Sequence, residues 1–235
     1  MLFLHGGGVA GWMWTPVLQH LGEGFACIVP DLPGHGRSAD QGYVSHAATV
    51  SDLAALIRET SPGGAIVVGF SLGAQLAVLL AAEHPSLVSG VLVVSGEAKP
   101  APLQSLTLAL LKWTAPLARQ KGFARLQAKQ LAVPGPLVDA YVRGSRELDI
   151  GTLLASVAEN IRFTLPDAWA SFAGSVSVLV GEKERALMRD SARLIHEANS
   201  GSTLLVVPAS AHDIPFTAPG LLADAIRTTA ASERR

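Results

Sequence analysis

Hydrophobic positions along the chain form two kinds of segment. Short, continuously apolar runs predict six strands, at residues 2–4, 26–30, 65–69, 90–94, 176–180 and 203–207. Longer segments with the three-to-four-residue spacing of helices lie at residues 14–21, 43–59, 73–84, 186–198 and 220–231. Continuously apolar strands are typical of a parallel sheet buried on both faces. The pattern therefore predicts an α/β fold, a three-layer α/β/α sandwich with a mostly parallel sheet of six strands.

This alternation is interrupted between residues 98 and 172. The stretch shows a helical pattern punctuated by prolines and contains no convincing strand. Its helices are expected at about residues 103–113, 117–131, 136–148 and 150–163. Each is apolar along one side and must cover another surface. We therefore predict a core formed by residues 1–97 and 173–235, with residues 98–172 inserted as a helical cap.

The composition fits a globular chain with a large core and a small-molecule partner. Of 235 residues, 49% are hydrophobic, and 18 basic against 19 acidic residues leave a net charge of -1. This balance favours neither nucleic acid nor an anionic membrane surface, so we expect no nucleic-acid or membrane partner. We expect a monomer or homodimer.

Two further features bear on the compartment. No apolar run approaches the roughly 20 residues that cross a bilayer, and residues 1–4 lack the basic start of a secretory signal. The single cysteine, Cys27, falls in a predicted strand, where we expect a buried and inert thiol. Both features predict a cytoplasmic protein.

The strongest chemical signal is the motif Gly69-Phe70-Ser71-Leu72-Gly73, which joins a predicted strand directly to a predicted helix. In such a sharp turn the serine is held out at the carboxyl end of the sheet, and the small flanking residues let the helix approach the strand. The N-terminus of the helix offers free N–H groups and a positive dipole end to an oxyanion. The motif predicts Ser71 as a nucleophile.

A serine nucleophile needs a base, and His212 is the best placed of the seven histidines. It follows the last predicted strand, in a loop at the same edge of the sheet as Ser71. The base in turn needs an acid to set its tautomer. Glu184 follows the next-to-last strand and is our first choice. Glu97, which follows the strand at residues 90–94, is the alternative acid.

The glycines that follow the first strand form a second candidate site. Residues 5–8, His-Gly-Gly-Gly, let backbone N–H groups approach a ligand, and the N–H of Leu72 is the second donor expected for an oxyanion hole. The loop lacks the spacings of phosphate-binding glycines. Trp12, just beyond it, is a candidate for substrate binding. The sequence shows no histidine–carboxylate spacing typical of a metal site, so we expect neither a metal nor a cofactor.

These segments together resemble the α/β-hydrolase superfamily. The resemblance rests on residues 4–7, the segment 31–38 (DLPGHGRS), the motif 69–73, residues 181–184, and Ala211-His212. It covers residues 2–220 apart from the cap, and within the superfamily it is strongest to cap-bearing esterases, carbon–carbon bond hydrolases and perhydrolases. It departs from the usual pattern in having glutamate for the acid and alanine before the histidine.

The resemblance implies roles, a topology and a reaction. Ser71 would be the nucleophile, His212 the base and Glu184 the acid, with the N–H groups of Gly7 and Leu72 as the oxyanion hole. The strands would lie in the order 2-1-3-4-5-6, without the amino-terminal antiparallel pair of the family. The implied enzyme is a serine hydrolase, a carboxylesterase that cleaves a small, fairly apolar ester through an acyl-enzyme. Carbon–carbon hydrolysis of keto acids, perhydrolysis, and a small-molecule receptor with a retained triad stay open as alternatives.

Overall fold

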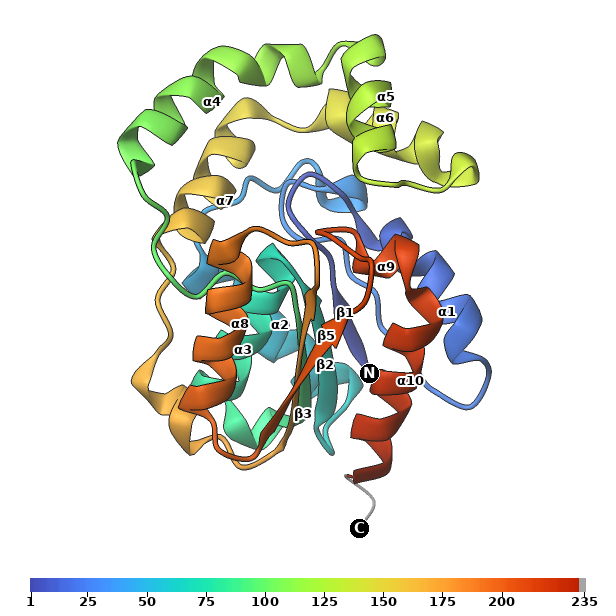
Figure 1. Cartoon of the computed structure of the whole chain (residues 1–235), viewed down its shortest axis with the longest axis vertical. Coiled ribbons are helices and arrows are strands. Elements are labelled where there is room, and N and C mark those ends of the chain that lie inside the picture. Colours follow the sequence, from blue (N-terminus) through green and yellow to red (C-terminus); the bar gives the residue numbers. More distant parts are fainter. Residues whose placement is uncertain (233–235) are drawn as a thin grey trace.

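The structure, a computed structural model, describes residues 1–232 and has three layers, with a sheet between two sets of helices (Figure 1). The sheet consists of β1 (Leu2–Leu4), β2 (Ala65–Phe70), β3 (Val88–Val94), β4 (Ser175–Gly181) and β5 (Ser202–Val207). Neighbouring strands are all parallel, and the strands within the described residues follow one another in chain order. Their carboxyl ends therefore meet at one edge of the sheet.

Two hydrophobic cores, one on each face, cover the sheet except at the partly exposed edge strand β5. The helices of one face are α2 (His46–Thr60), α3 (Leu72–Glu83) and α8 (Ala186–Ala198), and those of the other are α1 (Thr15–Leu21), α9 (Ile214–Thr217) and α10 (Pro219–Ser232). Successive strand residues point to opposite faces, so Leu2 and Leu4 belong to the first core and Phe3 to the second. The predicted α/β sandwich is confirmed.

The predicted count of six strands is wrong, because residues 26–30 do not form a strand. They make a single parallel bridge, in which the Phe3 N–H donates to the Ile28 carbonyl at 2.9 Å and the Ile28 N–H donates to the Met1 carbonyl at 2.8 Å. The next bond of a parallel ladder would come from residue 30, a proline without an N–H group. The bridge lies beside β1, where the predicted order places the second strand. Cys27, expected to be buried, is exposed at this edge.

The cap region contains four α-helices between β3 and β4. They are α4 (Gln104–Ala118), α5 (Lys121–Gln130), α6 (Val138–Glu147) and α7 (Ile150–Arg162), and they lie over the carboxyl edge of the sheet (Figure 1). Helix α4 packs against α7, and α5 packs against α6. After α7 the chain returns to the core, where Trp169 is fully buried and its indole N–H donates to the Ile195 carbonyl at 3.0 Å.

His5, in the loop after β1, makes stability depend on pH. It is fully buried, its Nε2 accepts the Leu32 N–H at 2.9 Å, and its Nδ1 contacts the Gly6 carbonyl at 2.8 Å. Burial lowers the pKa of His5 from 6.5 to about 3. The unfolded chain binds a proton below about pH 6.5 and the folded chain does not, so stability falls as the pH drops.

We expect the free energy of unfolding to be about 2 kcal/mol lower at about pH 5 than at about pH 7.5 through His5 alone. Burial also lowers the pKa values of His35 and His46, which adds to the effect in the same direction. Urea unfolding at both pH values measures it. The His5→Gln variant, although less stable, should lose less on acidification, and an equal loss in both chains would contradict the assignment to His5.

Candidate active site

Ser71 occupies a strained turn between β2 and α3. Its backbone has φ 54° and ψ -114°, a region that residues with a side chain rarely adopt. Glycine is required on both sides of this turn. A Cβ on Gly69 would lie 2.1 Å from the Gly73 carbonyl oxygen, and one on Gly73 would lie 2.2 Å from the Leu4 carbonyl oxygen. The close approach of strand and helix thus fixes the Ser71 hydroxyl at the carboxyl edge of the sheet.

Three side chains from three loops form a continuous hydrogen-bonded chain at this edge. The Ser71 Oγ lies 3.0 Å from the His212 Nε2, and the His212 Nδ1 lies 3.2 Å from the Glu184 Oε2. The Glu184 side chain is fully buried, whereas that of His212 is 40% exposed. Because the Glu184 carboxylate accepts from Nδ1–H, the Nε2 of a neutral His212 is left to accept the Ser71 proton. The structure therefore brings together all three residues predicted as a triad.

Ser95 holds the Glu184 carboxylate in place and was missed in the sequence. Its hydroxyl donates to the Glu184 Oε1 at 2.5 Å, and the Gly181 N–H donates to the same oxygen at 3.2 Å. These two donors leave Oε2 for His212. The available signal for Ser95 was its position directly after β3, at the edge where the other polar loops meet.

Glu97 lies in the same cavity but outside the hydrogen-bonded chain. The cavity has a volume of about 450 Å³ and is lined by Ser71, His212, Glu97 and Arg185, among others. The Glu97 Oε1 is buried and has no hydrogen-bond partner in the described part of the chain. Burial raises the pKa of the Glu97 carboxyl, and the neighbouring His212 and Arg185 oppose that rise. The structure thus places Glu184, not Glu97, on the Nδ1 of His212.

Of the three glycines after β1, Gly7 alone has a backbone N–H without an acceptor in the described chain. The Gly6 N–H donates to the Met13 sulfur at 3.5 Å, and the Gly8 N–H donates to the His35 Nε2 at 3.2 Å. Within residues 1–232, the N–H groups of Gly7 and Leu72 have no acceptor. A Cβ built on Gly7 would lie 3.9 Å from the Leu72 side chain, so the two residues are neighbours. Two free donors therefore flank the Ser71 turn.

Trp12 does not line the cavity that contains Ser71. Its ring stacks on Phe216 with centroids 6.3 Å apart and meets Tyr141 edge-on at 6.4 Å. It lines a separate cavity of about 550 Å³, together with Arg37 and Arg143. The structure therefore leaves Trp12 outside the wall of the Ser71 cavity.

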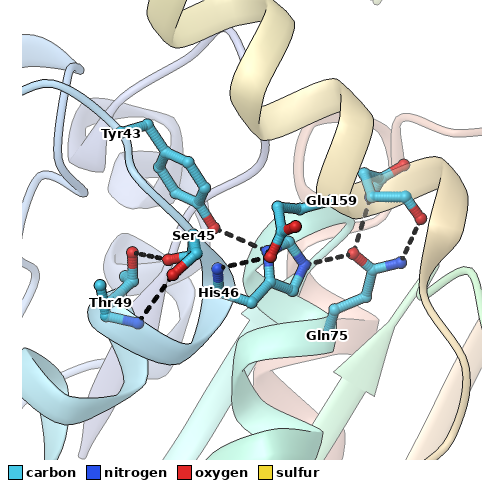
Figure 2. Close-up of polar contacts among 8 residues, drawn as sticks. Tyr43, Ser45, His46, Thr49, Gln75 and Glu159 are labelled. Carbon is cyan, nitrogen blue, oxygen red and sulfur yellow. Dashed lines mark hydrogen bonds and ion pairs between the residues drawn. The ribbon is translucent and has the colours of Figure 1, made fainter.

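A buried polar network connects the cap to the helix that follows Ser71 (Figure 2). The Gln75 Oε1 contacts the His46 Nε2 at 2.9 Å, and the Gln75 Nε2 donates to the carbonyls of Glu97 at 2.8 Å and Asn160 at 3.1 Å. On the other side of the imidazole, the Tyr43 hydroxyl lies 2.8 Å from Nδ1. Because Oε1 accepts from Nε2–H, the neutral imidazole accepts from Tyr43. Through these bonds, the Gln75 side chain of α3 holds the backbone of Glu97 and Asn160, two residues of the cavity wall.

The His46 backbone adds a second link between core and cap. Its N–H, at the start of α2, donates to the Glu159 Oε2 of α7 at 2.9 Å (Figure 2). The chain from α2 through α3 to α7 was not predicted, because its members are 29 and 85 residues apart along the sequence.

Neither a metal-binding cluster nor a membrane-spanning helix is found among the described residues. They contain no group of three or more histidine, cysteine, aspartate or glutamate side chains that could hold a metal ion. None of the helices in residues 1–232 is both long and apolar enough to span a bilayer.

Known sequences match most of the chain. A family model described as the alpha/beta hydrolase family matches residues 1–225. An esterase of Mycobacterium tuberculosis is 33% identical over 166 residues, which cover 69% of this chain and 52% of that protein. A pimeloyl-(acyl-carrier protein) methyl ester esterase of Vibrio cholerae is 37% identical over 99 residues, which cover 42% of this chain and 37% of that protein. The chain thus spans about half of the first relative's length and less of the second's.

Solved structures share the fold over nearly the whole chain. A thermophilic esterase from Thermogutta terrifontis has a TM-score of 0.81 at 20% identity and covers 100% of this chain and 90% of its own. An esterase from Exiguobacterium antarcticum also has a TM-score of 0.81 at 20% identity and covers 97% of this chain and 90% of its own. The family match and the shared fold agree with the nucleophile turn described above. This chain belongs to the alpha/beta hydrolase family.

Proposed function

We propose that this chain is a serine hydrolase that cleaves the carboxylic esters of small, largely apolar molecules. One observation carries the proposal, namely the hydrogen-bonded chain from Ser71 through His212 to Glu184 at the carboxyl edge of a parallel sheet. The relatives in Mycobacterium tuberculosis and Vibrio cholerae, both named as esterases, support ester hydrolysis within the family.

Acylation of Ser71 is the first half of the reaction. As the Ser71 Oγ attacks the ester carbonyl, the His212 Nε2 takes its proton, and the buried Glu184 carboxylate stabilises the imidazolium. The carbonyl oxygen becomes an oxyanion, to which the N–H groups of Gly7 and Leu72 donate. The C–O bond to the alcohol then breaks, the alcohol leaves with the proton from His212, and the acyl group stays on Ser71.

Hydrolysis of the acyl-enzyme is the second half. A water molecule gives a proton to the His212 Nε2 and attacks the acyl carbon, which forms a second oxyanion at the same two N–H groups. The bond to the Ser71 Oγ breaks, the carboxylic acid leaves, and Ser71 recovers its proton from His212. Besides the ester and water, the proposed reaction uses only groups of this chain.

The cavity around Ser71 supports a substrate of modest size. Leu131 of the cap and Leu187 and Met188 of α8 form apolar parts of its wall. Its cations, Lys183 and Arg185, come from the loop after β4 rather than from the cap. These cations favour a second candidate, the carbon–carbon hydrolysis of a keto acid, because they can bind a substrate carboxylate.

The test combines turnover with active-site labelling. The chain is assayed on p-nitrophenyl esters of increasing acyl length and on a keto acid, and a fluorophosphonate is used to label the serine nucleophile. We expect many turnovers on short esters and a single adduct that peptide mapping places on Ser71, with no labelling of heat-unfolded protein. An adduct on another residue would contradict the proposed nucleophile. Turnover of the keto acid alone would favour the second candidate.

A further inference from the structure

Helix α4 carries an apolar stripe on the outside of the cap. Leu106, Leu110, Trp113 and Leu117 recur every three or four residues, which places them on one side of the helix. They are respectively 53%, 56%, 84% and 42% exposed. In Figure 1, α4 forms the rim of the molecule, with α7 between it and the core. The stripe is therefore an outward surface.

The opposite side of α4 faces inward. Leu111, Ala115 and Ala118 line a cavity of about 260 Å³, together with Gly7 of the loop after β1. The helix is thus apolar on both sides, although only the inner side is needed for packing. An outer stripe whose large apolar side chains stay exposed in the described chain points to a contact outside it.

Exposed apolar side chains are concentrated in this part of the molecule. Seven of the ten large hydrophobic side chains that are exposed in the described chain lie between Leu103 and Leu126, and the others are Val44, Leu205 and Val206. Besides the four of the stripe, they include Leu126 of α5, which is 54% exposed, and Phe123, which is 37% exposed and also lines the 260 Å³ cavity. We call residues 103–126 the α4–α5 surface.

Charge distinguishes the same region from the rest of the chain. Residues 98–138 contain six basic residues and no acidic one, although the whole chain has a net charge of -1. All six are exposed, namely Lys99, Lys112, Arg119, Lys121, Arg125 and Lys129. Of these six, Arg125 alone has a carboxylate within 4.0 Å among the described residues, that of Asp139. Exposed apolar and basic side chains are therefore combined in one stretch of the cap.

We propose that the α4–α5 surface docks on an anionic lipid surface. A helix with leucine and tryptophan on one side and basic residues beside them lies in the interface, with its apolar side at the headgroup–acyl boundary. Tryptophan suits this boundary because its ring is both apolar and polar, and lysine side chains extend their charge to the lipid phosphates. The net charge of -1 for the whole chain does not reveal this local basic region. Lipid docking therefore differs from the sequence-based expectation of no membrane partner.

A second copy of the chain fits this surface less well. A twofold contact through the surface would place its four cations, Lys112, Arg119, Lys121 and Arg125, against the same four of the other copy, although only Arg125 has a carboxylate nearby in the described chain. Anionic lipids instead supply the opposite charge together with an apolar layer. The inference does not depend on the proposed hydrolase activity.

Vesicle flotation with the 235-residue chain tests the proposal. We expect binding to phosphatidylcholine vesicles that contain about a third phosphatidylglycerol, and at least about tenfold weaker binding to pure phosphatidylcholine or at about 1 M salt. Lys112→Ala combined with Lys121→Ala should weaken binding about 25-fold, at about fivefold for each cation. Leu110→Ser combined with Trp113→Ser should weaken it at least about tenfold.

Matched controls are Val44→Ser, which removes an exposed apolar side chain outside the surface, and Arg58→Ala, which removes an exposed cation from α2. Both should bind vesicles like the unchanged chain. All the substituted side chains are exposed, so we expect every variant to fold. Circular dichroism checks this expectation.

Four outcomes would overturn the proposal. The first is an absence of binding to anionic vesicles, and the second is unchanged binding by the Leu110/Trp113 variant. The third is a concentration-dependent dimer that light scattering detects, that the Leu110/Trp113 variant loses, and that forms without any binding to vesicles. This result would assign the surface to a second copy of the chain. Binding to polyglutamate but not to vesicles would assign it to an acidic protein and would likewise refute lipid docking.

Discussion

Hydrolysis of p-nitrophenyl butyrate falls by about four orders of magnitude or more in kcat when Ser71 is replaced with alanine. The substitution removes the only atom that the proposed mechanism makes covalent with the acyl group, and His212 is left with no hydroxyl to deprotonate. Substrate binding should change little because the side chain loses only its Oγ. We therefore expect KM to stay within a few-fold and the loss to fall on kcat.

Ser191→Ala is the matched control for Ser71→Ala. Ser191 is a buried serine whose Oγ has no hydrogen-bond partner within the described chain, and it lies in α8 and does not line the Ser71 cavity. It should retain full activity, and both variants should unfold near the temperature of the unchanged chain. If Ser71→Ala kept more than about one hundredth of the original kcat, the nucleophile would have to be sought elsewhere.

Glu184→Gln should lower kcat by about a hundredfold to ten-thousandfold, whereas Glu97→Gln should leave it within a few-fold. Glutamine keeps the size of Glu184 and removes the charge that stabilises the His212 imidazolium. Its amide can also present a donor to Nδ1, which favours the wrong tautomer. Glu97 makes no such contact, because its Oε1 has no hydrogen-bond partner in residues 1–232.

The two glutamine variants control for each other, because both neutralise a carboxylate in the same 450 Å³ cavity. If the loss came only from the changed charge of the cavity, kcat would fall alike in both variants. If one carboxylate is the acid of the triad, kcat falls only in the variant that lacks it. Both rates are measured across pH, so that the loss of kcat does not depend on the choice of a single pH. A large loss in Glu97→Gln with near-normal Glu184→Gln would make Glu97 the acid.

Local sequence patterns predicted most of the layers and the nucleophile turn. The motif at residues 69–73 requires glycine where a Cβ would meet backbone 2.1 Å or 2.2 Å away, and this requirement shows directly in the sequence. Likewise, the order of serine, acid and histidine along parallel strands places Ser71, Glu184 and His212 at one edge. Such features can be predicted from the sequence because each depends on residues close together in the chain or on the common direction of parallel strands.

Local sequence patterns did not correctly predict other features. The apolar run at residues 26–30 looks like a strand, but its ladder stops where Pro30 lacks an N–H group facing β1. Trp12 follows the glycine loop in sequence, yet its ring is held by Phe216 and Tyr141 away from Ser71. The first ladder ends at a proline within the run itself, whereas the position of the Trp12 ring depends on neighbours distant in sequence.

The sequence by itself determined the layered fold, the nucleophile turn and two candidate acids for His212. Only the tertiary structure placed Glu184 on the His212 Nδ1, with Ser95 beneath it, and left Glu97 unpaired in the cavity. It also showed that apolar side chains of α4 and α5 are exposed in the same stretch of chain as exposed basic ones, a local concentration that the net charge of -1 for the whole chain does not reveal. The physical reason is the same throughout: periodicity and strained turns are local, whereas hydrogen-bond partners and exposure are set by residues that only folding brings together.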